Sequence, residues 1–341
     1  MRNSASNKST ATAILSLHKL GDSVFTIPAI KEIMKNRGQD CYLFCFEETK
    51  PIFTLFFREE SLITFKHSDF ILDDRIAKSI VRKKLGEIKP STIYDLTGSI
   101  RSASILFPYT GNCIIGTNEN YFKTIYTDFI PKRTDPHLID IYLDVISSTI
   151  PGRENLKEFP IQTTRDGYLL IHPFAGWAAK EWNLTKFIKL AEHLNEHYEV
   201  IIVSPPNKIN EDISEELKFL GIRLVETETT SELIEVINNC SMIISNDSGP
   251  VYIANIIGKP TFSIYGPTNP KFSVPYGQNH RYFRKVIKCS PGEGDQYCFT
   301  DAGRNGCPSI ECMNLISLTE IEKKLIPFIE ELNIKPKEIS K

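Results

Sequence analysis

The sequence has no apolar run approaching the roughly 20 residues that are needed to span a bilayer. Its first apolar stretch, 13–17, is too short for the core of a signal peptide, and no small-residue cleavage site follows it. An excess of charge of one sign is also absent, since 40 basic residues face 42 acidic ones. A nucleic-acid binder normally carries a basic excess. We therefore expect a cytoplasmic protein without a nucleic-acid partner, in contact with a membrane at most peripherally, at the inner face of the cytoplasmic membrane.

Three common catalytic motifs are missing as well. No G-x-x-x-x-G-K-[ST] loop occurs, which argues against a P-loop nucleotidase. Gly292 and Gly294 do not open a dinucleotide-binding fingerprint, because Tyr297 stands where its third glycine should be. No G-x-S-x-G occurs either, and no histidine is indicated as the partner of a serine nucleophile, which argues against a serine hydrolase.

The paired C-x-x-C spacing of a zinc knuckle is absent, although four cysteines crowd into a glycine-rich segment near the C-terminus. They are Cys289, Cys298, Cys307 and Cys312. Because no secretory signal is present, reduced thiols are the leading expectation. Two alternatives stay open, namely a structural zinc held by the four thiolates and a disulfide.

The residues that are present indicate a two-domain α/β protein. A chain of 341 residues, 41% apolar and 24% charged, has a globular composition and the length of two domains. Short apolar strands alternate with amphipathic helices, which favours parallel sheets with right-handed crossovers. The expected strands are 13–17, 41–46, 93–96, 113–116, 168–171, 200–204, 222–225, 242–245 and 261–264. The expected helices are 24–36, 76–86, 100–107, 135–149, 184–197, 211–220, 230–239, 251–257 and 318–332.

The alternation pauses once, at a linker-like stretch spanning 150–160, and then restarts. We therefore expect two doubly wound domains, 1–155 and 156–341, that face a cleft. The last helix either closes the second domain or crosses back to the first. In such sheets ligands lie outside the carboxyl ends of the strands.

The first motif, Gly21 and Asp22, follows the opening strand and leads into a helix. Glycine would allow a tight turn, and an aspartate at or near the helix N-cap satisfies free backbone N–H groups. That capping role is one interpretation. The other is a carboxylate directed into the cleft, where it would act as a general base.

The second motif spans 171–183 and leads from a strand into a helix. Small residues such as Gly176 before a helix N-terminus suit an anion, because backbone N–H groups and the helix dipole point at it. Lys180 would add a full positive charge against a departing diphosphate. The alternative is that Lys180 is a solvated loop cation and Trp182 a core residue.

The third motif connects a buried strand to a helix. It consists of Asn246, Asp247, Ser248, Gly249 and Pro250, which follow the expected strand directly. Asp247 or Ser248 would anchor the first turn of the helix, but capping accounts for only one of these residues. A turn this polar suits contacts with sugar hydroxyls or with phosphate.

Taken together, the motifs resemble those of glycosyltransferase family 9, the heptosyltransferase-like family. The matching residues are Gly21 and Asp22; His172, Pro173, Lys180 and Trp182; Asp247, Ser248, Gly249 and Ala254; the runs 258–260 and 266–268; Asp95 to Thr97 with Arg101; and 311–313. The resemblance implies a GT-B fold of two Rossmann-like domains. It also implies an inverting, metal-independent transfer of a heptose or related hexose from a nucleotide-diphosphate sugar. ADP-heptose is the typical donor, no cofactor is required, and the acceptor is a lipopolysaccharide or another cell-envelope glycan.

The same resemblance implies roles for single residues. Asp22 becomes the general base, Lys180 with Gly176 contacts the phosphates, and the turn 246–250 binds the donor. Lys19 and Arg101 are candidate acceptor-side cations, with an ordinary solvated basic surface as the alternative.

Two departures from the family pattern bear on function. Tyr252 stands where the family usually has a histidine, and Ala175 and Gly176 stand where hydroxyl side chains are frequent. They motivate a second hypothesis, a degenerate non-catalytic module that binds nucleotide sugars. A nucleotide-sugar epimerase is a poorer third, because the histidines are scattered and only His172 lies within these motifs.

Overall fold

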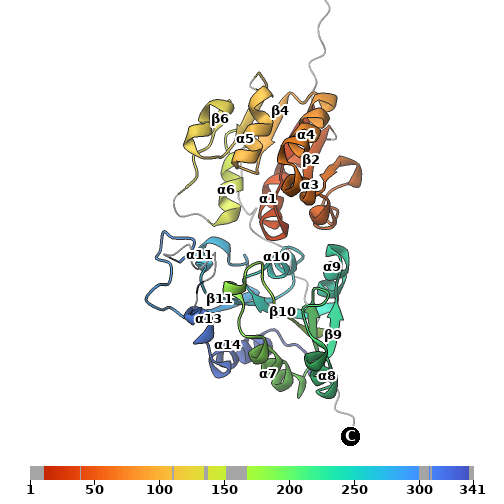
Figure 1. Cartoon of the computed structure of the whole chain (residues 1–341), viewed down its shortest axis with the longest axis vertical. Coiled ribbons are helices and arrows are strands. Elements are labelled where there is room, and N and C mark those ends of the chain that lie inside the picture. Colours follow the sequence, from red (N-terminus) through yellow and green to blue (C-terminus); the bar gives the residue numbers. More distant parts are fainter. Residues whose placement is uncertain are drawn as a thin grey trace, which may run out of the picture. The chain divides into compact units, whose positions relative to one another are not determined.

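The computed structural model describes residues 11–38, 40–109, 111–133, 137–150, 167–298, 307 and 309–337. The chain divides into two compact units, Met1–Leu156 and Lys157–Lys341, which Figure 1 colours from red to yellow and from green to blue. In the described part, each unit is built around one six-stranded parallel sheet. All but the first residue of the expected linker, 150–160, lie outside the described residues.

The sheet of the first unit has the strand order β3-β2-β1-β4-β5-β6. Its strands are β1 Thr12–Leu15, β2 Cys41–Phe46, β3 Leu62–Phe65, β4 Thr92–Asp95, β5 Cys113–Gly116 and β6 Asp128–Phe129. The α-helices are α1 Leu20–Arg37, α2 Lys50–Phe53, α3 His67–Leu72, α4 Asp74–Ile88, α5 Ile100–Leu106 and α6 Leu138–Val145. This order reverses direction between β1 and β4, which makes their carboxyl ends the switch point where doubly wound sheets bind ligands.

The second unit repeats this topology with the order β12-β11-β10-β7-β8-β9. Its strands are β7 Tyr168–His172, β8 Val200–Ser204, β9 Arg223–Glu226, β10 Cys240–Asn246, β11 Thr261–Tyr265 and β12 His280–Arg284. The helices are α7 Leu184–Asn195, α8 Glu211–Phe219, α9 Thr230–Asn239, α10 Gly249–Ile256, α11 Pro270–Ser273, α13 Glu311–Asn314 and α14 Leu318–Glu331. Here the switch point lies between β7 and β10.

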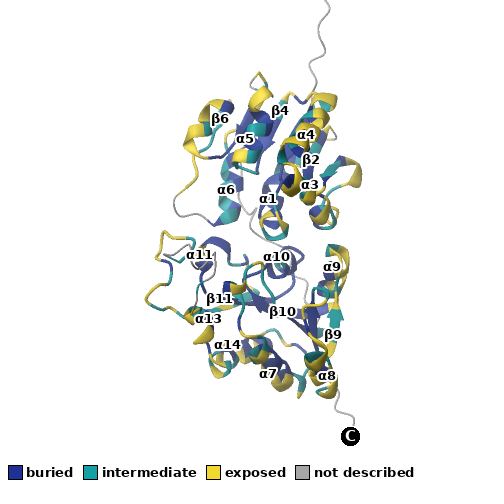
Figure 2. Cartoon of the chain, in the orientation of Figure 1, coloured by how far each residue is buried: buried dark blue, intermediate teal, exposed yellow. Residues whose placement is uncertain are grey.

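The central strands of both sheets are buried, as the dark-blue strands of Figure 2 show. Strands β8, β10 and β11 are buried along their whole length, which parallel strands covered on both faces require. The last helix, α14, contributes Ile321, Leu325 and Phe328 to the core of the second unit, so it closes that unit. None of the described helices is both long and apolar enough to cross a membrane.

The doubly wound topology predicted from the sequence is confirmed in both units, and most predicted strands and helices lie within three residues of their observed ends. Among the described elements, strands β3, β6 and β12 were not predicted. Most residues of β3 are only half-buried, β6 has two residues, and β12 carries two arginines and a histidine. These edge strands lack the apolar pattern that identifies a strand in sequence.

Candidate functional site

The second and third motifs meet at the switch point of the second unit. Strands β7 and β10 are parallel neighbours, and Ser245 pairs in register with His172. The loop after β7 and the turn after β10 therefore emerge side by side, although they are 73 residues apart in sequence. The predicted placement of these motifs at one sheet edge is correct.

Side chains of β10 hold the loop against the turn. Ser245 Oγ donates to the carbonyl of His172 at 2.7 Å and lies 3.0 Å from Ser248 Oγ. Asn246 Oδ1 accepts from the backbone N–H of Trp182 at 2.9 Å, and Asn246 Nδ2 donates to the carbonyl of Pro173 at 2.7 Å. The amide of Asn246, predicted as a donor contact, thus positions the loop instead.

His172 lies at the base of this arrangement and is buried. Burial lowers the pKa of its imidazole to about 4, because the charged form loses its hydration there. The ring is therefore neutral near pH 7. Its Nδ1 atom lies 3.3 Å from Ser245 Oγ, within the same network.

Lys180 and Asp247 form an ion pair in which Nζ lies 2.6 Å from Oδ2. The side chains are 16% and 2% exposed, so water screens the pair weakly. Burial alone would raise the pKa of Asp247, but the charge and hydrogen bond of Lys180 outweigh it and the pKa is lowered. Lys180 is also 4.6 Å from the ring centroid of Trp177. The alternative of a solvated loop cation is therefore wrong for Lys180.

Two further hydroxyl groups hold the carboxylate of Asp247. Thr268 Oγ1 donates to Oδ2 at 2.6 Å, and the hydroxyl of Tyr252 donates to Oδ1. Burial, followed by the neighbouring Asp247 charge, raises the pKa of Tyr252 far above its usual range, so its proton stays in place. From the sequence alone, Thr268 is included in the run 266–268 that matches the family but is given no role, and Tyr252 is treated only as a departure from the family pattern. The pairing depends on β10 and β11 being neighbours, which sequence spacing does not reveal.

The turn after β10 leaves the start of α10 without a side-chain cap. Ser248 is the N-cap residue, yet its side chain makes no capping hydrogen bond, and Asp247 turns toward Lys180 instead. The expectation that one of them anchors the first turn is wrong. Gly249 and Pro250 begin the helix, and proline is suited there because it removes an N–H that has no helical partner. In the loop after β7, a Cβ at Gly176 would meet no heavy atom within 4 Å.

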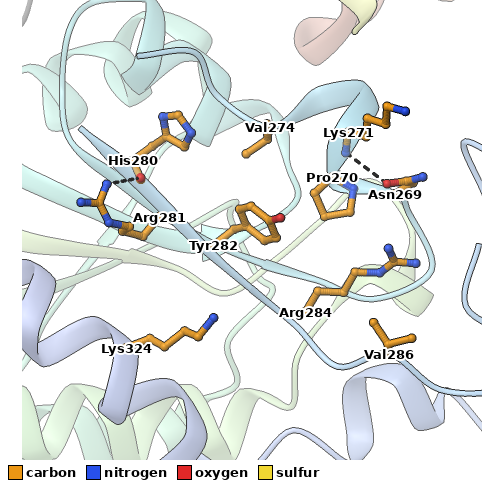
Figure 3. Close-up of a pocket in the computed structure, with 10 residues that line it drawn as sticks. All are labelled: Asn269, Pro270, Lys271, Val274, His280, Arg281, Tyr282, Arg284, Val286 and Lys324. Carbon is orange, nitrogen blue, oxygen red and sulfur yellow. Dashed lines mark hydrogen bonds between the residues drawn. The ribbon is translucent and has the colours of Figure 1, made fainter. Parts of the chain in front are cut away.

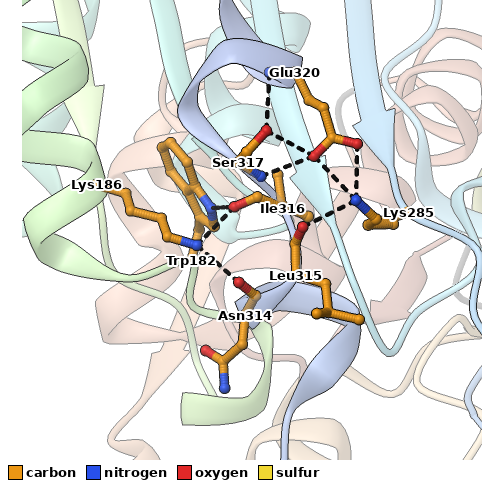
Figure 4. Close-up of polar contacts among 8 residues, drawn as sticks. All are labelled: Trp182, Lys186, Lys285, Asn314, Leu315, Ile316, Ser317 and Glu320. Atoms are coloured by element: carbon orange, nitrogen blue, oxygen red, sulfur yellow. Dashed lines mark hydrogen bonds and ion pairs between the residues drawn. The ribbon is translucent and has the colours of Figure 1, made fainter.

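Trp182 anchors the same loop to the end of the chain, as Figure 4 shows. Its indole is fully buried and donates to the carbonyl of Ile316 at 3.1 Å. Lys186 donates to the carbonyls of Ile316 and Asn314 at 2.7 Å and 2.8 Å. The core interpretation of Trp182 is correct, and its N–H adds a bond that fixes the loop of Lys180.

The four late cysteines line one cavity of about 30 Å³ beside Gly266 and Pro267. All four are free thiols, so the disulfide alternative is wrong for this structure. Burial, followed by the charges of the other three thiols, raises the pKa of Cys312 to about 11. Within the described ranges, no group of three or more histidine, cysteine or acidic side chains is arranged to hold a metal ion. The zinc alternative therefore gains no support.

In the first unit, Asp22 lies in the first turn of α1 and is exposed. Its carboxylate forms no hydrogen bond or ion pair with the described part of the chain. The N-cap is the exposed residue Lys19, so the capping interpretation of Asp22 is wrong. Gly21 lies inside the helix rather than in a tight turn. An unpaired carboxylate at this edge stays available for proton transfer.

The segment after β4 is occupied by internal contacts. Asp95 is fully buried and accepts from the hydroxyl of Tyr126 at 2.7 Å and from backbone N–H groups at 2.9 Å and 3.1 Å. Arg101 pairs with Asp74 at 3.1 Å and lies 5.0 Å from the ring centroid of Phe70. Of the two acceptor-side candidates, Arg101 is thus engaged within its unit, whereas Lys19 is exposed.

Comparison with known proteins points to one group of enzymes. The model of glycosyltransferase family 9 (heptosyltransferase) matches residues 80–300. Lipooligosaccharide heptosyltransferase 2 of Haemophilus influenzae is 30% identical over 181 residues, which cover 49% of this chain and about half, 52%, of that protein. Lipooligosaccharide heptosyltransferase 2 of Campylobacter jejuni is 26% identical over 300 residues, which cover 80% of this chain and 87% of that protein.

Solved structures agree on the fold. A glycosyl transferase family 9 protein from Veillonella parvula superposes with a TM-score of 0.71 at 17% identity, over 94% of this chain and 97% of its own. The Escherichia coli heptosyltransferase WaaC, solved with ADP, gives 0.69 at 14% identity, over 94% and 99%. The predicted GT-B fold of two Rossmann-like halves is therefore confirmed.

Proposed function

The chain belongs to glycosyltransferase family 9, the heptosyltransferases, and on this premise we propose that it is an inverting enzyme of cell-envelope glycan synthesis. It moves a heptose or a related hexose from a nucleotide-diphosphate sugar to a lipopolysaccharide-type acceptor. The names of the Haemophilus and Campylobacter relatives support the acceptor class. The ADP in the Escherichia coli structure supports ADP-heptose as the donor. So does the ADP-D-beta-D-heptose in the structure of a similar protein, the dodecameric iron-containing heptosyltransferase TibC.

The observation that carries this proposal is the Lys180–Asp247 pair at the switch point of the second unit. An ammonium group has three N–H donors, and the contact with Asp247 occupies one of them. The others are free to bind phosphate oxygens, while Asp247 fixes the direction of the side chain. The start of α10, which no side chain caps, supplies further N–H groups for an anion.

The proposed reaction needs one base and one site for the leaving group. Asp22 takes the proton of the acceptor hydroxyl, whose oxygen forms the new bond to the anomeric carbon. The bond from that carbon to the diphosphate breaks, and the nucleoside diphosphate leaves with the electron pair. Attack opposite the leaving group inverts the anomeric centre. Lys180 and helix N–H groups neutralise the charge that develops on the diphosphate, so the step requires no metal ion.

We also propose that the first unit touches the membrane that carries a lipid-linked acceptor. Ile71, Leu72, Ile76 and Ile100 are 71%, 83%, 60% and 71% exposed. They lie at the end of α3, near the start of α4 and at the start of α5, and both α3 and α5 contact α4. The exposed cation Arg75 lies among them. A cluster of exposed apolar side chains suits insertion into the interfacial region of a bilayer.

The test of the transferase is a panel of ADP-, GDP- and UDP-sugars with a heptose-deficient lipopolysaccharide core as acceptor. Wild-type protein is expected to transfer heptose from ADP-heptose. Asp22→Asn is expected to lower kcat by about 10²- to 10⁴-fold, the usual worth of a general base, with the donor KM nearly unchanged. Glu32→Gln, a charge-neutralising change on the same helix, is the matched control and should leave kcat unchanged.

The outcomes separate the hypotheses. Nucleotide binding in calorimetry without turnover of any donor, and without an effect of Asp22→Asn, would replace the enzyme by a sugar-nucleotide-binding module. If the donor sugar is epimerised and not transferred, the third hypothesis, a nucleotide-sugar epimerase, is indicated.

The membrane contact is tested by flotation with vesicles of phosphatidylglycerol and phosphatidylcholine. The wild type should float with the vesicles, and the Leu72→Gln/Ile76→Gln variant should not. Equal flotation of that variant and the wild type would refute the contact.

A further inference from the structure

A basic cavity of the described residues lies at the edge strand of the second unit (Figure 3), and neither Lys180 nor Asp247 lines it. It has a volume of about 730 Å³ and lies between α11, β12 and α14. Five of its ten lining residues are basic and none is acidic; the basic ones are Lys271, His280, Arg281, Arg284 and Lys324. We call this cavity the basic pocket.

One of the cations that line the basic pocket, Arg281, is neutralised by a carboxylate. Arg281 donates to both carboxylate oxygens of Glu331 at 2.9 Å and lies 4.7 Å from the ring centroid of Phe328. By contrast, no described carboxylate forms an ion pair with Arg284 or Lys324. Lys324 Nζ lies 5.6 Å from the ring centroid of Phe283, and at that distance a phenyl ring attracts a cation only weakly.

Arg284 is the least satisfied of these side chains. It donates from Nη2 to the carbonyl of Pro291 at 3.1 Å, while its Nε is buried and has no hydrogen-bond partner in the described structure. Burial lowers the pKa of its guanidinium, so the positive charge is held at a cost in hydration. A buried donor without a partner is uncommon in folded proteins, and it adds to the cost of holding this charge without a counter-ion.

An anion in the basic pocket would neutralise the charges of Arg284 and Lys324 together. Phosphate matches them best, because the planar fork of an arginine binds two phosphate oxygens at once and a lysine adds a point charge. A cavity of about 730 Å³ has room for more than one phosphate group. Carboxylate groups alone would leave several of the donors unused.

We propose that the basic pocket binds a ligand that carries phosphate groups, with Arg284 and Lys324 as its main contacts. This site is additional to the donor site and does not depend on the transfer reaction. The phosphate belongs either to a soluble or glycan-borne phosphate ester or to the headgroup of an anionic lipid. Both sources share the chemistry that the pocket recognises.

The direct test is calorimetric titration with inorganic pyrophosphate at low ionic strength. Arg284→Gln/Lys324→Gln is expected to weaken binding by about tenfold or more, since two charge-assisted contacts are lost. Lys323→Gln removes an exposed lysine at the neighbouring position of α14 that does not line the pocket, and it should bind as the wild type does. The wild-type affinity should fall as salt is added.

Pyrophosphate will also meet Lys180, so the titration is repeated with Lys180→Met. Binding that survives in Lys180→Met and is lost in the pocket variant supports the proposal. Binding that is lost only in Lys180→Met, or that is equal in all variants, overturns it. A thermal melt that matches the wild type shows that the pocket variant is folded.

Vesicles distinguish the two sources of phosphate. The vesicle comparison uses Leu72→Gln/Ile76→Gln protein, so that the proposed membrane contact of the first unit does not contribute. If a phosphatidylglycerol vesicle retains that protein and not the same protein with the pocket substitutions added, the ligand is a lipid headgroup. If only pyrophosphate distinguishes the two proteins, the ligand is a soluble or glycan-borne phosphate. If neither probe distinguishes them, the pocket is not a phosphate site. None of these results depends on whether sugar transfer is observed.

Discussion

Lys180 Nζ lies 2.6 Å from Asp247 Oδ2, and the pair is almost shut off from water. Removing one partner of a buried pair leaves an uncompensated charge, which costs more than the pair itself contributes. Asp247 therefore has two separate effects, one on the stability of the second unit and one on the direction of Lys180. Substitutions can distinguish them.

Lys180→Met should lower the free energy of unfolding by about 3 kcal/mol, because it leaves the Asp247 carboxylate buried and unpaired. Lys180→Met/Asp247→Asn should recover most of that loss, since the buried charge is gone. Neither variant should regain transferase activity, because the phosphate contact is absent in both. Urea unfolding and kcat/KM measure the two effects. Equal stability of the single and double variants would contradict the buried-pair interpretation.

Tyr252→Phe should lower the free energy of unfolding by about 2 kcal/mol, since a buried carboxylate loses a hydroxyl donor. Tyr282→Phe removes a hydroxyl from a tyrosine that is 42% exposed and is the matched control, with an expected change near zero. Chemical denaturation of both variants gives the comparison. If the two substitutions cost the same, the contact between Tyr252 and Asp247 is not a stabilising one.

The stability of the protein should depend on the protonation of His172. Its pKa in the folded state is about 4, whereas an unfolded histidine has about 6.5, so the unfolded chain binds the extra proton between these values. The neutral imidazole of His172 makes its full contribution to the free energy of unfolding above about pH 6.5. As the pH falls toward 4, this contribution is lost, and the free energy of unfolding decreases by about 3 kcal/mol. His172→Asn should remove this part of the pH dependence. His197→Asn, at an exposed position, should keep it, and a loss in both variants would rule His172 out.

Gly266→Ala should destabilise the second unit by about 1–3 kcal/mol, the usual cost of overpacking. A Cβ at this position would lie 2.4 Å from Met313 Sδ and 2.7 Å from Met313 Cγ, and Met313 is fully buried. Met313→Ala alone leaves a cavity and should cost about 2–5 kcal/mol. The double variant should cost less than the sum of the two, because the new methyl group occupies vacated space. Strict additivity in urea unfolding would contradict this contact.

Much of the framework could be predicted from the sequence because it rests on local patterns. Strand β8 is a continuous apolar run, and α9 begins with a threonine and a glutamate that form a capping box. Both elements were predicted with their observed bounds. Strand β12 has no such pattern, so the basic pocket that it lines could not be predicted.

The sheet edge at which the candidate site lies was predicted, but the hydrogen-bond and ion-pair partners of its side chains were not. Asn246 and Asp247 lie at the expected sheet edge, yet their side chains bind the protein itself. Which partner each one finds depends on the order of β7, β10 and β11, and sequence spacing alone does not fix that order. The sequence identified Asp22 as a carboxylate after the first strand, but it did not reveal that this side chain is exposed.

The hydrogen bond from Trp182 to the carbonyl of Ile316 has a consequence for how the molecule is made. The indole belongs to the loop that carries Lys180, but its acceptor lies 134 residues further along the chain. A ribosome releases about 5–20 residues each second, so the loop waits several seconds for its partner during synthesis. Until Ile316 and α14 have emerged, we expect a bulky indole and the apolar face that α14 covers to remain accessible to chaperones and proteases. The segment that contains Ile316 and α14 thus decides when the loop of Lys180 reaches its final position.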